Sequence, residues 1–190
     1  AFLMNAARYM NGADANDDLW SNDQGMGMMN LGMAFDGTAR ILRDQEPADT
    51  FTASGQSRAI SGLVNDSGKP VRISLSWTDA PGSTSGNAYN NNLNLSVTAG
   101  GKTYLGNVFN GAVSTNGGTA DAKNNTESVF LPAGTTGAVV VVVTAANINS
   151  DGVPNVEPAL DQDYALVIYN LDEVQMPVVM GESAALVAES

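Results

Sequence analysis

Oxygen-bearing side chains gather in the turn-rich stretches of this sequence. They are Asp79, Asn91, Asn92, Asn94, Asp121, Asn124, Asn125 and Glu127. A hard cation such as calcium takes about six to eight oxygen ligands from carboxylates, amides and backbone carbonyls. The same residue types also form turns by bonding to nearby backbone groups. The pattern therefore leaves two interpretations open, a calcium site and a set of turn formers.

Catalytic groups are scarce. With no histidine and no cysteine, the chain has no Ser-His-Asp triad, no imidazole ligand, no thiolate nucleophile and no zinc ribbon. No serine lies in a Gly-x-Ser-x-Gly elbow. Acidic pairs occur at Asp17-Asp18 and at Asp161 with Asp163, but glycosidase carboxylates follow no spacing rule in sequence. We interpret both pairs as solvated acidic loops and expect no catalysis by this chain alone.

The charge balance excludes several partners. The 190 residues include 8 Lys+Arg against 20 Asp+Glu, a net charge of −12, which argues against nucleic acid and anionic membranes as partners. No apolar run reaches the roughly 18 residues of a spanning helix. The first residues lack the basic leader and cleavage site of a signal peptide.

Alternating polarity predicts the elements that would position these groups. Val71, Ile73, Leu75 and Trp77 alternate with polar residues, which predicts a strand with Trp77 on its core face. We expect further strands at residues 93–98, 102–109, 126–131, 138–145 and 163–169, with Gly100-Gly101 as a two-residue hairpin turn. Strands without an intervening helical period indicate an all-β, antiparallel sandwich.

The residues before these strands differ in character. Apolar residues recur at helical spacing over residues 1–10, ahead of Asn11-Gly12, which predicts a short amphipathic helix whose apolar face needs a partner. Trp20, in the acidic loop that follows, is expected to contact another surface. We interpret residues 37–49 as a linker, 50–171 as the sandwich domain and 172–190 as a tail or the start of a further domain.

Several stretches together resemble one family. The first two are LMNAA at residues 3–7 and DQGMGMMNL at 23–31. The others are PVRISLSWTDAP at 70–81, NNLNL at 91–95, NNTESV at 124–129 and QDYALV at 162–167. Residues 1–36 resemble the end of a subtilisin-like catalytic domain, with Met26 where an aromatic residue is usual. Residues 51–170 resemble the C-terminal β-jelly-roll domain of some bacterial and archaeal subtilases, related more distantly to the P domain of proprotein convertases.

The resemblance implies a function. The catalytic Asp, His and Ser of a subtilase would lie upstream of this chain. The chain would then be a non-catalytic accessory domain that stabilises its own catalytic domain and also contacts protein substrate. Such enzymes are secreted, and their jelly rolls can carry structural calcium. The implied ligands are Asp79, Asn92, Asn94, Asn125 and Glu127. The family usually reads N-D-L-D-L where this chain has asparagines at 92 and 94, and the lost charge should weaken calcium binding.

A catalytic subunit completed by another chain stays open, if the parent protein is cleaved in place, and so do two other classes of protein. One is an independent carbohydrate- or matrix-binding sandwich, which would expose aromatic residues on one face, although aromatics are only 6% of this chain. The other is a calcium-stabilised adhesion repeat, which would show internal repeats of 20–50 residues, and the sequence has none.

Overall fold

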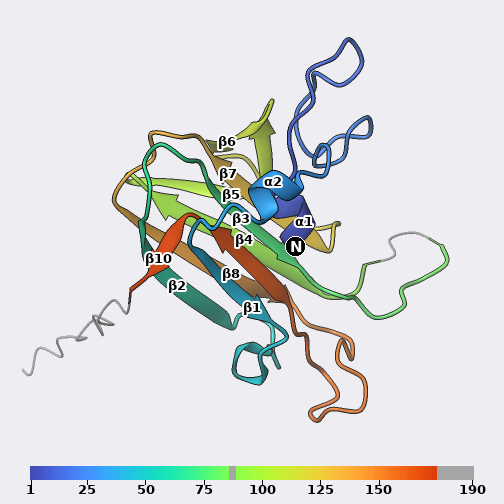
Figure 1. The fold of residues 1–190 in the computed structure, drawn as a ribbon. Coiled ribbons are helices and arrows are strands. Elements are labelled where there is room, and N and C mark those ends of the chain that lie inside the picture. Colours follow the sequence, from blue (N-terminus) through green and yellow to red (C-terminus); the bar gives the residue numbers. More distant parts are fainter. Residues whose placement is uncertain (86–88, 175–190) are drawn as a thin grey trace, which may run out of the picture.

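The computed structural model describes residues 1–85 and 89–174 as two antiparallel β-sheets with short helices at the N-terminal end (Figure 1). The helices are α1 (Phe2–Asn5), α2 (Leu31–Ala34) and the 3-10 turn η1 (Pro47–Asp49). The strands are β1 (Arg40–Asp44), β2 (Ser57–Val64), β3 (Val71–Ser76), β4 (Asn92–Ala99), β5 (Lys102–Asn110), β6 (Val113–Asn116), β7 (Thr126–Leu131), β8 (Ala138–Asn147), β9 (Ala165–Tyr169) and β10 (Leu171–Glu173).

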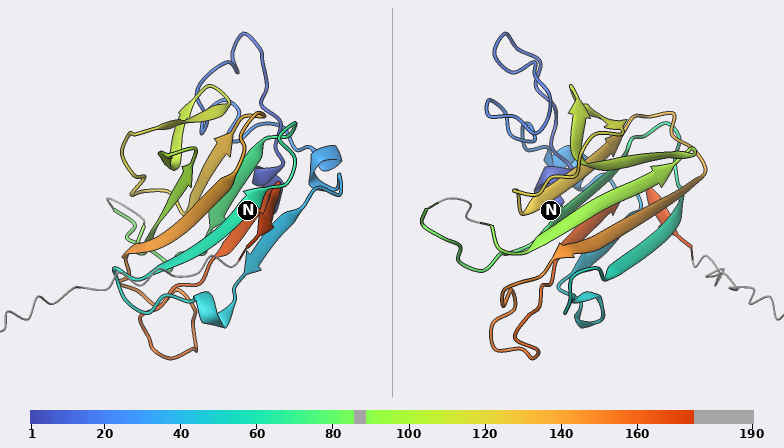
Figure 2. Two further views of the ribbon diagram at one scale, coloured as in Figure 1. Left: turned by 90° about the vertical axis from the view of Figure 1, so that its left-hand side faces the viewer. Right: turned by 180° about the vertical axis from the view of Figure 1, so that it is seen from behind.

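The strand order confirms the predicted all-β sandwich. One sheet has the order β1-β9-β3-β7 and the other the order β10-β2-β8-β4-β5-β6. Apart from the run β4-β5-β6, each strand is followed along the chain by a strand of the opposite sheet, as in a jelly roll. Figure 2 shows the two sheets lying face to face.

The core lies between the sheets. The apolar residues that alternate along β3, β4, β7 and β8 face inward and form one buried cluster. Trp77, only 5% exposed, belongs to this cluster, which confirms its predicted place in the core. The predicted hairpin is also confirmed, because Ala99 pairs with Lys102 and both glycines of the turn have positive φ, as a type I′ turn requires.

Two boundary predictions need correction. Residues 37–49 are not only a linker, because they contain β1, which pairs antiparallel with β9 at the edge of the four-stranded sheet. The helix predicted over residues 1–10 is shorter, since α1 ends at Asn5. Arg8 then exchanges backbone hydrogen bonds of 2.8 Å with Met28, and this pairing replaces further helical turns.

The N-terminal segment, residues 1–36, packs on the sandwich. Its helix α1 contacts β3 and β9 on the outer face of the four-stranded sheet, and its loops extend beyond one end of the sheets (Figure 2, blue). Within residues 1–85 and 89–174, no helix is long and apolar enough to cross a membrane. Most of the predicted tail, from residue 175 on, lies outside the described residues.

Candidate functional site

Asp79 closes the loop that follows β3. Its carboxylate accepts hydrogen bonds from the backbone N–H of Asn90 at 2.6 Å and of Asn91 at 2.9 Å, one to each oxygen. Both oxygens therefore satisfy backbone donors at the start of β4. In this structure Asp79 holds two distant chain segments together, as an Asx turn former does over a shorter range.

Asn92 and Asn94 lie on the outer face of the six-stranded sheet. Leu93 and Leu95 between and beside them are fully buried in the core, so the asparagines point away from it. The amide nitrogen of Asn92 donates to the side-chain oxygen of Asn94 at 3.3 Å. The two candidate ligands thus bond to each other.

Asn125 and Glu127 lie at the start of β7. The side-chain amide of Asn125 donates to the carbonyl of Trp77 at 3.0 Å, and Trp77 N–H donates to the Asn125 carbonyl at 3.1 Å, which extends the β3–β7 pairing. Glu127 points between the sheets and is 0% exposed. Its Oε2 accepts a 2.6 Å hydrogen bond from Leu95 N–H, while Oε1, also buried, has no partner among the described residues.

The five predicted ligands are therefore only partly brought together. Glu127 reaches the backbone of β4 from the core side, whereas the side chains of Asn92 and Asn94 lie on the opposite face of that strand. Among the described residues, no group of three or more Asp, Glu, His or Cys side chains is placed to hold a metal. Of the five, Glu127 is the residue with a buried oxygen free to bind a cation, and calcium at this set stays a prediction.

Glu127 is electrostatically unusual. Burial raises its pKa to about 8, the charge of Asp121 raises it as well, and the hydrogen bond from Leu95 N–H acts in the opposite direction. The carboxyl fits because β5 has a glycine beside it: a Cβ on Gly106 would overlap Glu127 Oε2 and lie 2.7 Å from Glu127 Cβ. The absence of a side chain at Gly106 therefore leaves the space that the Glu127 carboxyl occupies, beyond the last paired residues of β4 and β5, Ser96 and Leu105.

Asn107 completes this end of the sandwich, and the sequence offered no signal for it. Its side-chain amide donates to the Thr126 carbonyl at 2.8 Å and its Oδ1 accepts from Ser128 N–H at 3.0 Å, as a neighbouring strand would. It also donates to Asp121 at 2.8 Å. Burial opposes ionisation of Asp121, but the hydrogen bonds from Asn124 and Asn107 hold its pKa below the usual value.

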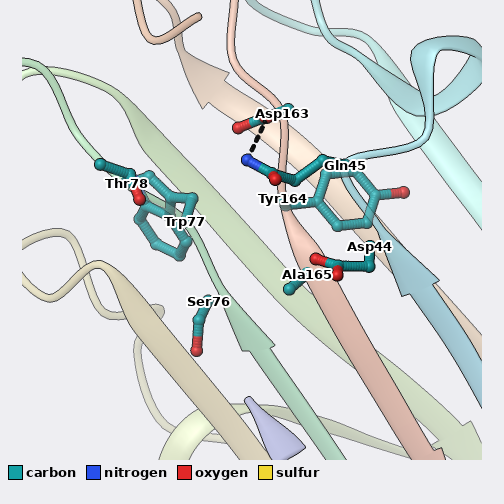
Figure 3. Close-up of a pocket in the computed structure, with 8 residues that line it drawn as sticks. All are labelled: Asp44, Gln45, Ser76, Trp77, Thr78, Asp163, Tyr164 and Ala165. Carbon is teal, nitrogen blue, oxygen red and sulfur yellow. Dashed lines mark hydrogen bonds between the residues drawn. The ribbon is translucent and has the colours of Figure 1, made fainter.

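A cavity of about 280 Å³ lies where β1 ends and β9 begins (Figure 3). It is lined by Asp44, Gln45, Ser76, Trp77, Thr78, Asp163, Tyr164 and Ala165. The Gln45 amide donates to Asp163 at 2.8 Å. Burial raises the pKa of Asp163 above its usual value, Gln45 opposes this, and the charges of Asp161 and Asp44 add to it. Carboxylates beside aromatic walls suit a cationic or hydroxyl-bearing group.

The interpretation of Asp161 and Asp163 as a solvated acidic loop is wrong. Asp161 is 0% exposed and Asp163 is buried. The physical reason is that the loop after β8 folds back, with Phe51 and Gln162 exchanging backbone hydrogen bonds of 2.9 Å. Asp18, by contrast, lies in an exposed loop, where it accepts a hydrogen bond from Gly111 N–H at 2.6 Å.

The outer face of the four-stranded sheet carries a buried arginine. Arg72 donates to the carbonyls of Asn5 at 2.9 Å and Ala7 at 2.6 Å, and its guanidinium carbon lies 4.0 Å from the ring centre of Phe130. Burial lowers its pKa to about 10, partly offset by Tyr169. In return, the Asn5 amide donates to the carbonyls of Arg72 and Val167 at 3.0 and 3.2 Å.

These contacts form a second, smaller core. Phe130 packs there with buried residues of the N-terminal segment, namely Ala7, Leu19 and Met26. Sequence reasoning missed Arg72 and Asn5 because a polar residue on the outer face of a strand is ordinarily solvated. Trp20, expected to contact another surface, is 43% exposed.

No protein-family model matches the chain, and no curated protein matches it either. The resemblance to subtilases therefore rests on the sequence motifs alone.

Proposed function

We propose that this chain is a non-catalytic accessory region of a secreted, subtilisin-like serine endopeptidase, and that its sandwich stabilises the end of the catalytic domain. The observation that carries the proposal is the burial of Arg72 beneath the N-terminal segment. Residues 1–36 are the part that resembles a catalytic-domain end, and they are the part that the sandwich covers.

The Arg72 contact makes the two parts depend on each other. The side chain is 9% exposed, and in residues 1–85 and 89–174 it has no carboxylate within ion-pair distance. Two carbonyls of the N-terminal segment and the face of Phe130 take the place of water. Because hydrogen bonds to a charged group contribute about 1.5–3 kcal/mol each, detaching the segment would leave unpaired groups on both sides.

The N-terminal segment exposes several large hydrophobic side chains beside its acidic loop residues. Its exposed large hydrophobic residues are Leu3, Trp20, Met28, Met29, Leu31 and Phe35, the last 74% exposed. Leu3, Trp20 and Met29 line one hollow of this apolar face, and exposed apolar surface of this kind is typical of an interface. In the proposed enzyme, this face would contact the rest of the catalytic domain, so that the segment lies between the catalytic domain and the sandwich.

Structural calcium is part of the proposal. Oε1 of Glu127 is a buried carboxylate oxygen without a partner among the described residues, and it suits a cation that prefers oxygen ligands. Secretion follows from the resemblance, and the net charge of −12 would favour solubility.

A carbohydrate-binding module is the less supported alternative. Its clearest candidate for a sugar platform, Trp77, is buried in the core and only 5% exposed. The cavity of Figure 3 is lined by this buried residue, by Tyr164 and by the carboxylates of Asp44 and Asp163.

Two measurements test the proposal. The polypeptide encoded upstream of Ala1 should contain the catalytic Asp, His and Ser of a subtilase, and their absence would overturn the proposal. In the full-length enzyme, Arg72→Gln should shorten the half-life of thermal inactivation. Arg58→Gln, in the other sheet, is the matched control. It loses a cation–π contact with Phe51 and hydrogen bonds to the carbonyls of Ala48, Ser57 and Thr50, all of them outside residues 1–36. Equal half-lives of the Arg72 variant and the wild type would contradict the stabilising role.

A further inference from the structure

We propose a calcium site in the loop between β8 and β9, formed by the carboxylates of Asp151 and Asp161. This loop extends from the end of the sandwich opposite to the N-terminal loops (Figures 1 and 2, orange against blue). The site uses none of the five predicted ligands, and the proposal does not depend on the proposed peptidase function.

Asp161 supplies the first observation. Its side chain is fully buried, and Oδ1 accepts hydrogen bonds from the backbone N–H of Gly152 at 3.1 Å and of Val153 at 2.9 Å. Its other oxygen, Oδ2, is buried and has no partner in the described part of the chain. One half of the carboxylate is thus fixed in place by the loop, and the other half is unpaired.

Asp151 places a second oxygen beside it. Asp151 and Asp161 are partners in a parallel β-bridge, and paired residues of a ladder project their side chains on the same side at neighbouring positions. Oδ1 of Asp151 is also buried and, among the described residues, also has no partner. The bridge therefore brings together two buried carboxylate oxygens that nothing in the described residues satisfies.

No basic side chain neutralises this pair. Neither aspartate forms an ion pair within residues 1–85 and 89–174. The sequence has no Lys, Arg or His at any position from 124 to 190. A buried charged oxygen without a partner is costly, and a bound cation would supply the missing partner for both carboxylates at once.

The loop ends beneath the site are firmly held. Asn91 Oδ1 accepts from the N–H groups of Asn149 at 2.9 Å and Ser150 at 3.1 Å, and its amide donates to the Asp161 carbonyl at 3.1 Å. The amide also donates to Gln162 Oε1 at 2.9 Å. The loop backbone and the Asp161 carboxylate are thus held in place before any ion binds, which lowers the entropic cost of binding.

The types of ligand at the site favour calcium over magnesium. Calcium accepts carboxylates together with waters in a flexible geometry, whereas magnesium demands near-ideal octahedral geometry and loses its waters reluctantly. A site with only two carboxylates should be weak, with a dissociation constant of about 10⁻⁴ to 10⁻³ M, as in extracellular modules.

The test is calcium titration of the 190-residue chain after treatment with EDTA. Calorimetry counts the ions bound, and circular dichroism follows the thermal midpoint. At a calcium concentration about 100-fold above the dissociation constant, the midpoint should rise by roughly 5 to 10 °C. Asp151→Asn and Asp161→Asn should each bind one calcium fewer than the wild type and lose the corresponding shift. Asp151→Asn is the safer variant, because Asp151 accepts no backbone hydrogen bond comparable to those that Asp161 receives.

Two variants serve as controls. Asp14→Asn removes the same charge from an exposed loop and should keep the wild-type stoichiometry. Glu127→Gln should also retain calcium at Asp151 and Asp161, so any loss in that variant reports the other predicted site. Wild-type binding of no calcium at millimolar concentration would overturn the proposal, and so would full wild-type stoichiometry in both Asp151→Asn and Asp161→Asn.

Discussion

Replacing Glu127 by glutamine tests whether a buried, unpaired carboxyl limits the stability of the sandwich. The pKa of Glu127 rises from 4.5 to about 8 on folding, chiefly because the side chain is buried. Since the folded chain binds this proton more tightly than the unfolded chain, the contribution of Glu127 is most favourable below pH 4.5. It is lost as the pH rises from 4.5 through 8.

The size of this loss follows from the pKa difference. One pKa unit corresponds to about 1.36 kcal/mol, so the whole rise amounts to roughly 5 kcal/mol at pH 8 and above, and roughly 3 kcal/mol at pH 7. Glutamine keeps an oxygen for Leu95 N–H, the donor to Glu127 at 2.6 Å, but carries no charge. Its amide nitrogen takes the place of the unpaired Oε1 and costs about 1 kcal/mol where it finds no acceptor.

Urea denaturation in EDTA at several pH values measures the effect. Glu127→Gln should be equal to or slightly less stable than the wild type at pH 4.5, and more stable by a few kcal/mol at pH 8. Glu46→Gln, at an exposed position, is the matched control and should differ from the wild type by the same small amount at every pH. A difference between Glu127→Gln and wild type that does not change with pH would refute the reasoning.

Three further substitutions probe the contacts that hold the sandwich together, each followed by the urea midpoint. Gly106→Ala inserts a methyl group against the buried Glu127 carboxyl and should lower the free energy of unfolding by about 3 kcal/mol; an unchanged midpoint would show that β5 shifts freely. Asn5→Ala removes the amide that bonds the Arg72 carbonyl and should cost about 2 to 3 kcal/mol, whereas a loss below about 0.5 kcal/mol would show that the N-terminal segment adds no stability. Asn107→Ala removes two hydrogen bonds to β7 and places alanine at φ +60°. We therefore expect the free energy of unfolding to fall by about 2 kcal/mol and amide exchange in β7 to become faster. Amide exchange as slow as in the wild type would contradict this expectation.

Strands that bury one whole face could be predicted from sequence. The six predicted strands correspond to β3, β4, β5, β7, β8 and β9, because burial on one side forces alternation or a continuous apolar run. β1 was missed because it is an edge strand in which Ile41 is the only fully buried residue. β2 was missed partly because Gly62 breaks its pattern. A Cβ at that position would lie 2.6 Å from the Asp172 carbonyl, so the close approach of β10 explains the glycine.

The N-terminal helix shows where periodicity misleads. Apolar spacing over residues 1–10 correctly indicated a face that packs on a partner, but not how long the helix lasts. The Asn5 amide bonds to the backbone of β3 and β9, and Arg8 pairs with Met28. Both contacts join residues far apart in the sequence, so a local pattern carries no information about them.

The candidate site, too, could be predicted from the sequence only in part. Asp79, Asn125 and Glu127, which the sequence offered as ligands or turn formers, all make contacts that fix the chain, and calcium at them stays a prediction. Their separate roles depend on partners that only the fold provides. Glu127 differs from Asp79 because the backbone of β4 offers it one donor, whereas Asp79 receives two. Sequence spacing could not distinguish a satisfied carboxylate from an unsatisfied one.

The abundance of Asn and Gly beside so few basic residues has a structural explanation. Carboxylates in this fold are mostly bonded by amides: Asp79 and Asp66 accept from backbone N–H groups, and Asp121 accepts from the side chains of Asn107 and Asn124. An amide neutralises no charge but satisfies the oxygen it reaches, so a chain with 20 acidic and 8 basic residues can fold with few ion pairs.

Hydrogen bonds from amides do not suffice where both oxygens of a carboxylate are buried. The unsatisfied carboxylate oxygens among the described residues belong to Glu127, Asp151 and Asp161, and they lie where neither a backbone donor nor a basic side chain is available. Glu127 can take up a proton, as its raised pKa indicates. The bridged residues Asp151 and Asp161 each bury a carboxylate oxygen that has no partner among the described residues, and the proposed cation would satisfy both. We therefore expect the stability of the chain to respond to pH chiefly through Glu127 and to calcium chiefly through the pair, and the variants above separate the two responses.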